Sequence, residues 1–479
     1  MVSNTFIKYF FLCLLFKFSL NRSGQLIFVY EHARHGARGP SSGFASYFKD
    51  GYDEYKIYWG TDGELSPIGK RQHYYLGVRN RLRYGKLLDF TQYNPMELLI
   101  HTTDYNRTHQ SIMSELYGMY EDLREKNLTD EETKFNMVND RYMYHSNQLL
   151  YKQIHDEIKL IDKKINKINF PILNVHTFPP KRIFLVDDCI KLNNYRLLMV
   201  GDQVREFYKE FDERFSNILQ DFMGQSSDYF HSYDNMKSVT DHFVCDYDNK
   251  KEKELKPLVD KGLNLLEFYD FSKRFYGHFI FNYFVDNYTS GLEETHLMQD
   301  LLGYMDRRIK YYPETTYKAP KMVMDCGHDT TVGPIARFIA NTFKVEYHKF
   351  CEFACNVYFE LYHEGDGKYT VDYYLDDELL IDHMDYNEFK DTMQKHFWND
   401  TYMDEFCGKR EDTNIENTSK IEQYSNLLLA ISVVSTMLFL IFITSTIVIF
   451  RRLKKLQKKF QENPLMDKDL EGSELPALT

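Results

Sequence analysis

A run of 24 uncharged and mostly apolar residues near the C-terminus, Leu427 to Phe450, is the feature that most restricts how this chain can fold. A helix of that length crosses a hydrocarbon layer of about 30 Å at roughly 1.5 Å per residue. A buried helix of a soluble domain is the alternative, but such helices rarely stay uncharged for so long. Four basic residues follow within 451–455, and positive charge marks the cytoplasmic side of a span. We therefore predict a transmembrane helix at 427–450 and a cytoplasmic tail at 451–479.

The opposite end has the layout of a secretory signal peptide over residues 1–23. Lys8 precedes an apolar stretch from Tyr9 to Phe16, and small or polar residues follow. An uncleaved anchor is the alternative, but the apolar stretch is too short to span a bilayer. The two ends together predict a single-pass type I membrane protein with its body in a lumen or outside the cell. The lysosomal or endosomal membrane and the plasma membrane both stay open.

The cysteines and glycosylation sequons of the body fit that compartment. An even number of cysteines in an oxidising space predicts disulfides, although the sequence alone does not decide their pairing. The candidates are Cys189, Cys245, Cys326, Cys351, Cys355 and Cys407. The close spacing of Cys351 and Cys355 favours a short-range bridge over a zinc site, because no second pair of ligands stands nearby. The glycosylation candidates are Asn127, Asn287, Asn399 and Asn417.

Composition excludes several classes of protein. The chain has 479 residues, 43% of them hydrophobic, which is enough for a large core and excludes disorder over most of its length. Its formal net charge is −12, and the part between the two terminal segments holds 49 basic against 66 acidic residues. Non-specific nucleic-acid binding requires clustered positive charge over a broad surface. We therefore expect no nucleic-acid partner.

Three short apolar runs, at residues 26–30, 96–100 and 321–325, are typical of buried strands. Each is followed by a charged or histidine-rich loop, and helical spacing fills residues 67–83 and 104–120. This alternation predicts an α/β fold, a three-layer sandwich with a largely parallel central sheet.

The pattern changes along the chain and predicts domain boundaries. Residues 131–315 have helical spacing with few strand signals, whereas strand-like alternation returns at 356–362 and 369–375. We predict a core that is split by a mainly helical cap domain and followed by a stalk. The boundaries are 24–130 for the first part of the core, 131–315 for the cap, 316–410 for the second part and 411–426 for the stalk.

The loops after the three predicted strands carry the groups needed to bind and transfer a phosphoryl group. The first loop reads Arg34-His35-Gly36-Ala37-Arg38-Gly39-Pro40, the second contributes Arg107, and the third contributes His328 and Asp329. One guanidinium group can donate hydrogen bonds to two phosphate oxygens at once, and an imidazole can act as a nucleophile. A basic surface loop is the alternative for the first motif alone. Since the carboxyl ends of parallel strands meet at one crevice, we expect these side chains to surround one dianion.

In these motifs the chain resembles the histidine acid phosphatases, a branch of the histidine phosphatase superfamily. The family pattern Arg-His-Gly-x-Arg-x-Pro matches residues 34–40, and residues 103–108 and 328–331 match two further blocks. The resemblance implies that His35 becomes phosphorylated and that Asp329 protonates the leaving alcohol and then assists water. It implies no metal or cofactor. The groups that it assigns to the phosphoryl oxygens are Arg34, Arg38, Arg107 and His328.

The same resemblance implies two disulfides, Cys351 with Cys355 and Cys189 with Cys407, which leaves Cys245 with Cys326. It implies a phosphomonoester substrate and leaves a homodimer open. A phytase or inositol-polyphosphate phosphatase is the nearest alternative, and a phosphoglycerate-mutase-like enzyme shares only part of the first motif. A catalytically inactive surface binding module is the alternative from another class.

Overall fold

The computed structural model describes residues 24–41, 63–120, 174–178, 189–250, 252–282, 287–314, 318–346, 351–407 and 451–455. The chain divides into two compact units, Met1–Gly408 and Lys409–Thr479. Within the described ranges, no helix is both long and apolar enough to cross a membrane. The predicted signal peptide at 1–23, stalk at 411–426 and span at 427–450 lie outside the described residues.

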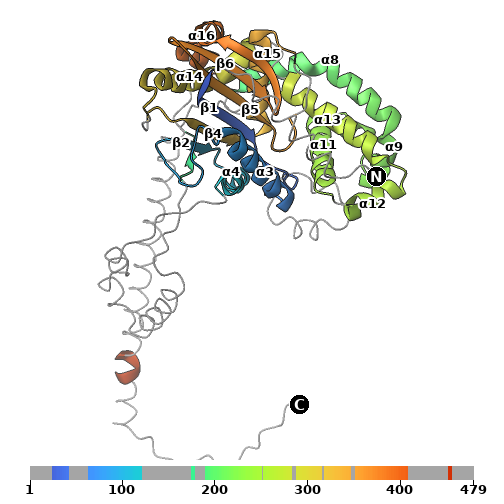
Figure 1. Ribbon diagram of the computed structural model, residues 1–479. Coiled ribbons are helices and arrows are strands. Elements are labelled where there is room, and N and C mark those ends of the chain that lie inside the picture. The colour runs from blue at the N-terminus through green and yellow to red at the C-terminus, as the bar shows by residue number, and fades with distance from the viewer. Residues whose placement is uncertain are drawn as a thin grey trace, which may run out of the picture. The chain divides into compact units, whose positions relative to one another are not determined.

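One seven-stranded sheet in the order β3–β2–β4–β1–β5–β6–β7 forms the centre of the first unit (Figure 1). The four strands from β3 to β1 pair in parallel, and β5, β6 and β7 continue the sheet as an antiparallel meander. The mixed α/β class that the sequence predicts is confirmed. The strands are β1 (Gln25–Arg34), β2 (Leu98–Thr102), β3 (His176–Thr177), β4 (Met322–Gly327), β5 (Asn356–Gly365), β6 (Lys368–Leu375) and β7 (Glu378–Asp385).

Helices cover both faces of the sheet because its central strands are apolar on both sides. Phe28 and Tyr30 of β1 belong to one buried cluster, and Val29 between them belongs to another. The cluster around Val29 includes residues of α3 (Pro67–Tyr84) and α4 (Asn106–Met119). The opposite cluster includes residues of α14 (Asn287–Tyr311), α15 (Asp329–Phe343) and α16 (Tyr386–Gln394).

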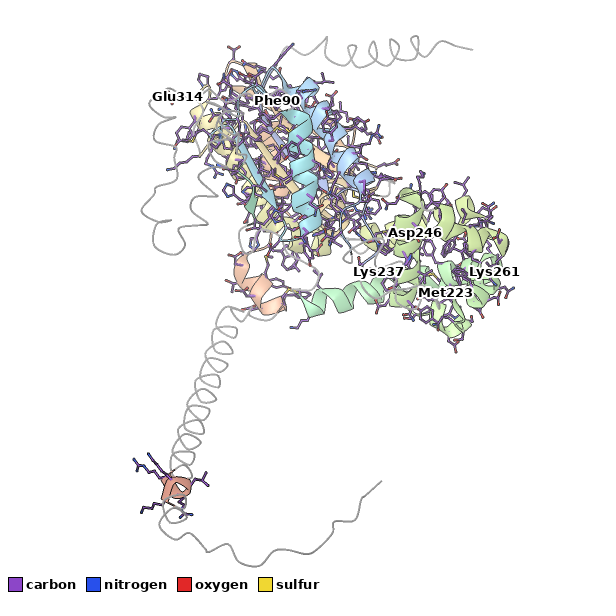
Figure 2. The ribbon with its side chains drawn as sticks, turned by 90° about the horizontal axis from the view of Figure 1, so that it is seen from below. Phe90, Met223, Lys237, Asp246, Lys261 and Glu314 are labelled. Atoms are coloured by element: carbon purple, nitrogen blue, oxygen red, sulfur yellow. A yellow bond between two sulfur atoms is a disulfide. The ribbon has the colours of Figure 1, made fainter. Side chains whose placement is uncertain are left out.

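The described helices within residues 190–282, between β3 and β4, form a group beside the sheet, the helical group. Figure 2 shows them at Met223, Lys237, Asp246 and Lys261, apart from the sheet region that bears Phe90 and Glu314. Their buried phenylalanines nevertheless join the same apolar cluster as Phe28 and Tyr30. The helices of this group are α8 (Ile190–Arg214), α9 (Ser216–Met223), α10 (Ser227–Phe230), α11 (Tyr233–Asp248), α12 (Glu252–Asp260) and α13 (Leu265–Asn282). A further helix, α17 (Asp400–Cys407), lies near the C-terminal end of the first unit.

The first strand is longer than its apolar run predicts. β1 continues through Glu31, His32 and Arg34, and the backbones of all three pair with β4. Glu31 and His32 also pair with β5 on the other side of β1. All three polar side chains are buried and have partners. The strand therefore carries the first residue of the 34–40 motif into the interior.

Candidate active site

Three neighbouring strand ends bring the sequence motifs together. In the order β2–β4–β1, Thr102 lies opposite Cys326 and Gly327 lies opposite Arg34. The backbone N–H of His35 donates to the Gly327 carbonyl oxygen (2.9 Å), and that of Thr103 donates to the Cys326 carbonyl oxygen (3.1 Å). The three loops therefore leave the sheet at one level and on the same edge, as the parallel arrangement predicts.

The proton of the His35 imidazole is fixed by the backbone. Nδ1 lies 2.8 Å from the carbonyl oxygen of Gly36, which accepts hydrogen bonds and cannot donate them. Nδ1 therefore carries the hydrogen, and the lone pair of the neutral ring is on Nε2. The ring is 2% exposed. Burial, together with the positive charges of Arg107 and Arg34, holds the pKa of His35 well below its usual value, which favours the neutral ring.

A chain of hydrogen bonds also fixes the second histidine. Arg107 Nη2 donates to His328 Nδ1 (3.2 Å), so the hydrogen of the neutral ring is on Nε2, which contacts Thr103 Oγ1 at 3.0 Å. Burial and the charge of Arg107 lower the pKa of His328 to about 3. The rings of His35 and His328 meet edge to face with centroids 5.4 Å apart.

Arg34 is buried between a carboxylate, a carbonyl and an aromatic ring. Its Nη2 lies 2.7 Å from Asp329 Oδ2, and Nη1 donates to the carbonyl oxygen of Cys351. The guanidinium carbon lies 4.3 Å from the centroid of the Phe353 ring. This surrounding holds the side chain in one orientation beside His35.

Arg38 is anchored from the helical group. It makes two hydrogen bonds to Asp241 of α11, at 2.8 and 3.2 Å, and its Nη1 lies 3.3 Å from the sulfur of Cys245 one turn further along. Burial lowers the pKa of Arg38, but Asp241 opposes this effect and the result lies well above the ordinary value. Asp241 is not predictable from the sequence, because a single aspartate on a helix has no distinctive spacing.

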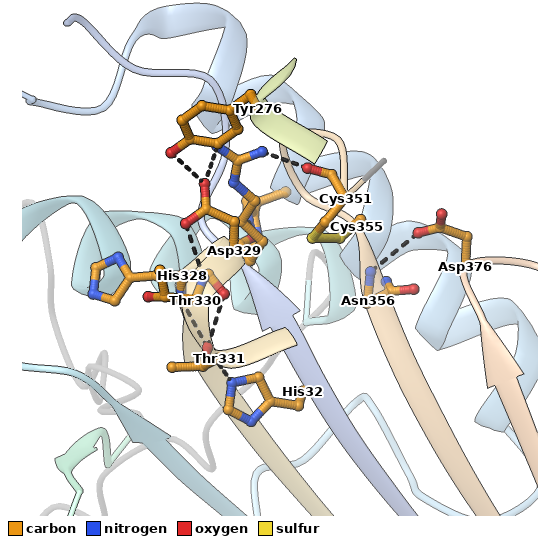
Figure 3. Close-up of a disulfide and its surroundings, with 12 residues drawn as sticks. His32, Tyr276, His328, Asp329, Thr330, Thr331, Cys351, Cys355, Asn356 and Asp376 are labelled. Carbon is orange, nitrogen blue, oxygen red and sulfur yellow. Dashed lines mark hydrogen bonds and ion pairs between the residues drawn. A yellow bond between two sulfur atoms is a disulfide. The ribbon is translucent and has the colours of Figure 1, made fainter. Parts of the chain in front are cut away.

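Asp329 is the first residue of α15, and three donors contact its carboxylate (Figure 3). Arg34 and the hydroxyl of Tyr276 both contact Oδ2, at 2.7 and 3.0 Å, and the backbone N–H of Thr330 donates to Oδ1 at 2.8 Å. Burial raises the pKa of Asp329, but Arg34, Arg38 and the other donors lower it more, so its pKa is below the ordinary value. These donors therefore favour the ionised form of Asp329.

The loop that carries His35 packs closely on the start of α3. A Cβ on Gly36 would lie 2.4 Å from the Gly69 carbonyl oxygen, and one on Gly69 would lie 2.1 Å from the Ala37 carbonyl oxygen. Ser66 caps the helix by accepting from the N–H of Gly69 (3.0 Å). Only glycines allow this approach of backbone to backbone.

Behind the site lies a fully buried polar network that the motifs do not predict. His73 Nε2 lies 3.0 Å from the Arg34 carbonyl oxygen and so donates to it, which leaves His73 Nδ1 to accept from Glu115 Oε2 at 3.0 Å. Burial lowers the pKa of His73 to about 4 and raises that of Glu115 to about 8. The two groups are therefore a neutral hydrogen-bonded pair in acid, and not an ion pair.

A family model for the histidine phosphatase superfamily (branch 2) matches residues 25–376. The chain belongs to this superfamily. The superfamily motif at 34–40 lies at the end of β1, and the described residues of all three motifs surround one position in the fold.

Among the proteins of known function that are similar to this chain in sequence are acid phosphatases. Lysosomal acid phosphatase of Xenopus laevis is 35% identical over 101 residues, which cover 21% of this chain and 22% of the relative. Prostatic acid phosphatase of Homo sapiens is 38% identical over 113 residues, which cover 23% and 28%. The aligned parts thus span less than a third of either relative's length.

Solved structures similar to this superfamily member include a phytase from Citrobacter braakii, with a TM-score of 0.48 and 12% identity over 78% of this chain and 98% of that one. A multiple inositol polyphosphate phosphatase from Bifidobacterium longum has a TM-score of 0.45 and 13% identity over 75% and 87%.

Two disulfides of this superfamily member agree with the pairing that the resemblance implies. Cys189 is bonded to Cys407 and Cys351 to Cys355. The third expected pair is wrong, since Cys245 and Cys326 are both free and buried. Cys245 packs with Ala37 and Phe353, whereas Cys326 packs with the α3 and α4 side of the sheet, so they belong to different clusters.

The glycosylation candidates are only partly within the described residues. Asn399 is exposed, and its side-chain oxygen accepts from the N–H of Tyr402 at the start of α17. Asn287 is the first residue of α14. Asn127 and Asn417 lie outside the described residues.

Proposed function

We propose that this protein is an acid phosphatase that hydrolyses phosphate monoesters through a phosphohistidine at His35. The single observation that carries the proposal is the hydrogen bond from His35 Nδ1 to the Gly36 carbonyl oxygen. It directs the free Nε2 lone pair of a neutral imidazole into a site with three guanidinium groups. This is the arrangement that a nitrogen nucleophile needs to attack a phosphate dianion.

In the first step, Nε2 of His35 attacks phosphorus and the bond from phosphorus to the ester oxygen breaks. Arg34, Arg38 and Arg107 stabilise the equatorial phosphoryl oxygens, where negative charge is spread in the transition state, and His328 joins them when a phosphoryl oxygen replaces Thr103 as the partner of its Nε2–H. Asp329 gives its proton to the departing alkoxide, so the alcohol leaves neutral. The guanidinium charges also oppose protonation of His35, which keeps the nucleophile active in acid.

In the second step, water attacks phosphorus and the bond to Nε2 breaks. Asp329, now ionised, takes the proton of the water, and inorganic phosphate leaves. The nearby positive charges lower the pKa of Asp329 and favour its ionised form. A bound phosphate dianion offsets those charges, which raises the pKa, and an acidic compartment then favours the protonated form that the first step requires.

The described rim of the site supports a simple monoester over an inositol polyphosphate. Tyr105 is 48% exposed, and the centroid of its ring lies 4.9 Å from that of His328 and 4.5 Å from the guanidinium carbon of Arg107. The carboxylate of the neighbouring Asp104 is 94% exposed. An aromatic and an acidic group at this position favour a leaving group of low negative charge.

We propose a lumenal or extracellular place for the catalytic body, held by the segment 427–450. The relatives named lysosomal acid phosphatase support a lysosomal address. An acidic lumen would also favour the protonated state of Asp329 in the first step.

The test is phosphate release by the full-length protein at pH 5 without added metal, from 4-nitrophenyl phosphate, glycerol 2-phosphate and phytate. The His35→Ala variant removes the nucleophile, and we expect at least a thousandfold loss. His231→Ala is the matched control, because His231 pairs with the exposed Asp212 in the helical group. Release from phytate alone would favour the phytase alternative, and no release by folded wild type would favour the binding module.

A further inference from the structure

Among the donors to Asp329 in the described part of the chain, the hydroxyl of Tyr276 comes from the helical group. Tyr276 lies on α13, is 6% exposed, and donates to Asp329 Oδ2 at 3.0 Å (Figure 3). None of the sequence motifs includes it. The ring of Tyr276 lies in the interior, and its hydroxyl is directed at Asp329, the proposed proton donor.

The three donors on Asp329 differ in what they can do when the carboxylate takes up a proton. The guanidinium of Arg34 and the backbone N–H of Thr330 can only donate. A tyrosine hydroxyl can donate to a carboxylate and can also accept from a carboxylic acid. Burial keeps the pKa of Tyr276 well above its usual value, so the hydroxyl retains its own proton. Tyr276 can thus serve both protonation states without ionising.

We propose that Tyr276 is a positioning residue that stabilises ionised Asp329 for the attack of water and then turns to accept when Asp329 is protonated. This inference rests on the proposed phosphatase mechanism. The donated hydrogen bond lowers the pKa of Asp329 because it stabilises the charged carboxylate. The ionised form assists the second step, whereas loss of the protonated form limits the first step as the pH rises.

Other charged groups also face Asp329 and would remain in a variant that lacks the hydroxyl. They are Arg34 at the end of β1, Arg38 from the loop after it and Arg107 from α4. The titratable ring of His328 also faces Asp329, and Asp241 of α11 faces Tyr276. Removing one neutral donor leaves this set unchanged. A change in the pH profile would therefore report the hydroxyl itself.

The variant Tyr276→Phe keeps the ring and removes the hydroxyl. Losing a donor to the charged form raises the pKa of Asp329, so the alkaline limb of kcat/KM for glycerol 2-phosphate should move up by about half to one pH unit. Activity on this ester on the alkaline limb should rise about three- to tenfold relative to wild type at the same pH. The limb for 4-nitrophenyl phosphate should move less, because nitrophenolate leaves without a proton.

The matched control is Tyr269→Phe on the same helix. Its hydroxyl donates to Asp248 at 2.6 Å and has no described contact with Asp329. We expect an unchanged pH profile. In the background of Asp329→Asn, which cannot ionise, Tyr276→Phe should cause no further shift.

An equal loss on both esters at every pH would overturn the proposal and make Tyr276 a packing residue. A shift that persists in the Asp329→Asn background would assign the hydroxyl to another group. Wild-type turnover and its loss in His35→Ala are measured in the same series, so failure of the phosphatase mechanism itself would be recognised separately.

Discussion

Arg38 and Asp241 form a two-point ion pair between the loop after β1 and helix α11. The side chains are 6% and 9% exposed, so the pair is largely shielded from water. Removing one partner of a buried pair leaves the other charge uncompensated, which costs more than the pair itself contributes. Asp241 thus pairs with the Arg38 guanidinium and holds it in the position proposed for phosphate binding.

We predict that Asp241→Ala lowers the free energy of unfolding by about 3 kcal/mol, because Arg38 is left buried and unpaired. Saturating inorganic phosphate should then raise the Tm of the variant more than that of wild type, since the anion replaces the lost carboxylate. Thermal unfolding with and without phosphate measures both effects. An equal rise in Tm in the two proteins would show that Arg38 does not contact the anion.

The pair of His73 and Glu115 leads to a prediction about stability and pH. Burial raises the pKa of Glu115 from its ordinary value to about 8, so between about pH 5 and 8 the folded state holds a proton that the unfolded chain has lost. Stability from this group is fully present below the unfolded pKa and falls as the pH rises toward 8. Glu115→Gln cannot ionise and mimics the protonated acid. Its unfolding free energy should therefore match wild type at pH 5 within about 1 kcal/mol and exceed it at pH 8.5.

Denaturant unfolding at the two pH values provides the measurement for Glu115→Gln. Glu115→Ala is the comparison, because it removes the partner of His73 and leaves a cavity, and it should be destabilised at both pH values. If Glu115→Gln were less stable than wild type at pH 8.5, the carboxylate would have to be charged in the folded protein.

The two free cysteines give a prediction that thiol counting can test. Both Cys245 and Cys326 are fully buried, and burial raises their thiol pKa values well above the ordinary one. We expect neither to react with a thiol reagent in the native body, and two to react after denaturation without reductant. Cys245→Ser and Cys326→Ser should each remove one. A denatured body with no reactive thiol would show that the two cysteines form a bond.

The sequence predicts the parts of the site that lie next to strands. Arg34, His328 and Asp329 directly end or follow a buried apolar run, and parallel strands bring such ends together whatever the rest of the chain does. The same reasoning predicts α3 and α4, whose helical spacing lies between those strands. It misplaces the end of β1, because buried Glu31 and His32 interrupt the apolar pattern while their partners come from distant segments.

Asp241, Tyr276 and Glu115 are not predictable in this way. Each is an ordinary polar residue on a helix, and its importance arises only when that helix packs against another part of the chain. The pairing of Cys245 with Cys326 fails for the same reason, since counting cysteines does not say which cluster each one joins.

The helical group between β3 and β4 supplies both Asp241 and Tyr276, and its apolar interior is continuous with that of the sheet. It therefore cannot be exchanged between relatives as an independent module for altering selectivity. A chimaera that received this segment from another superfamily member would take both the anchor of Arg38 and the hydroxyl beside Asp329 from the donor protein. An exchange of this segment that is meant to change only the substrate would therefore also change the pKa of Asp329 and the pH dependence of the resulting enzyme.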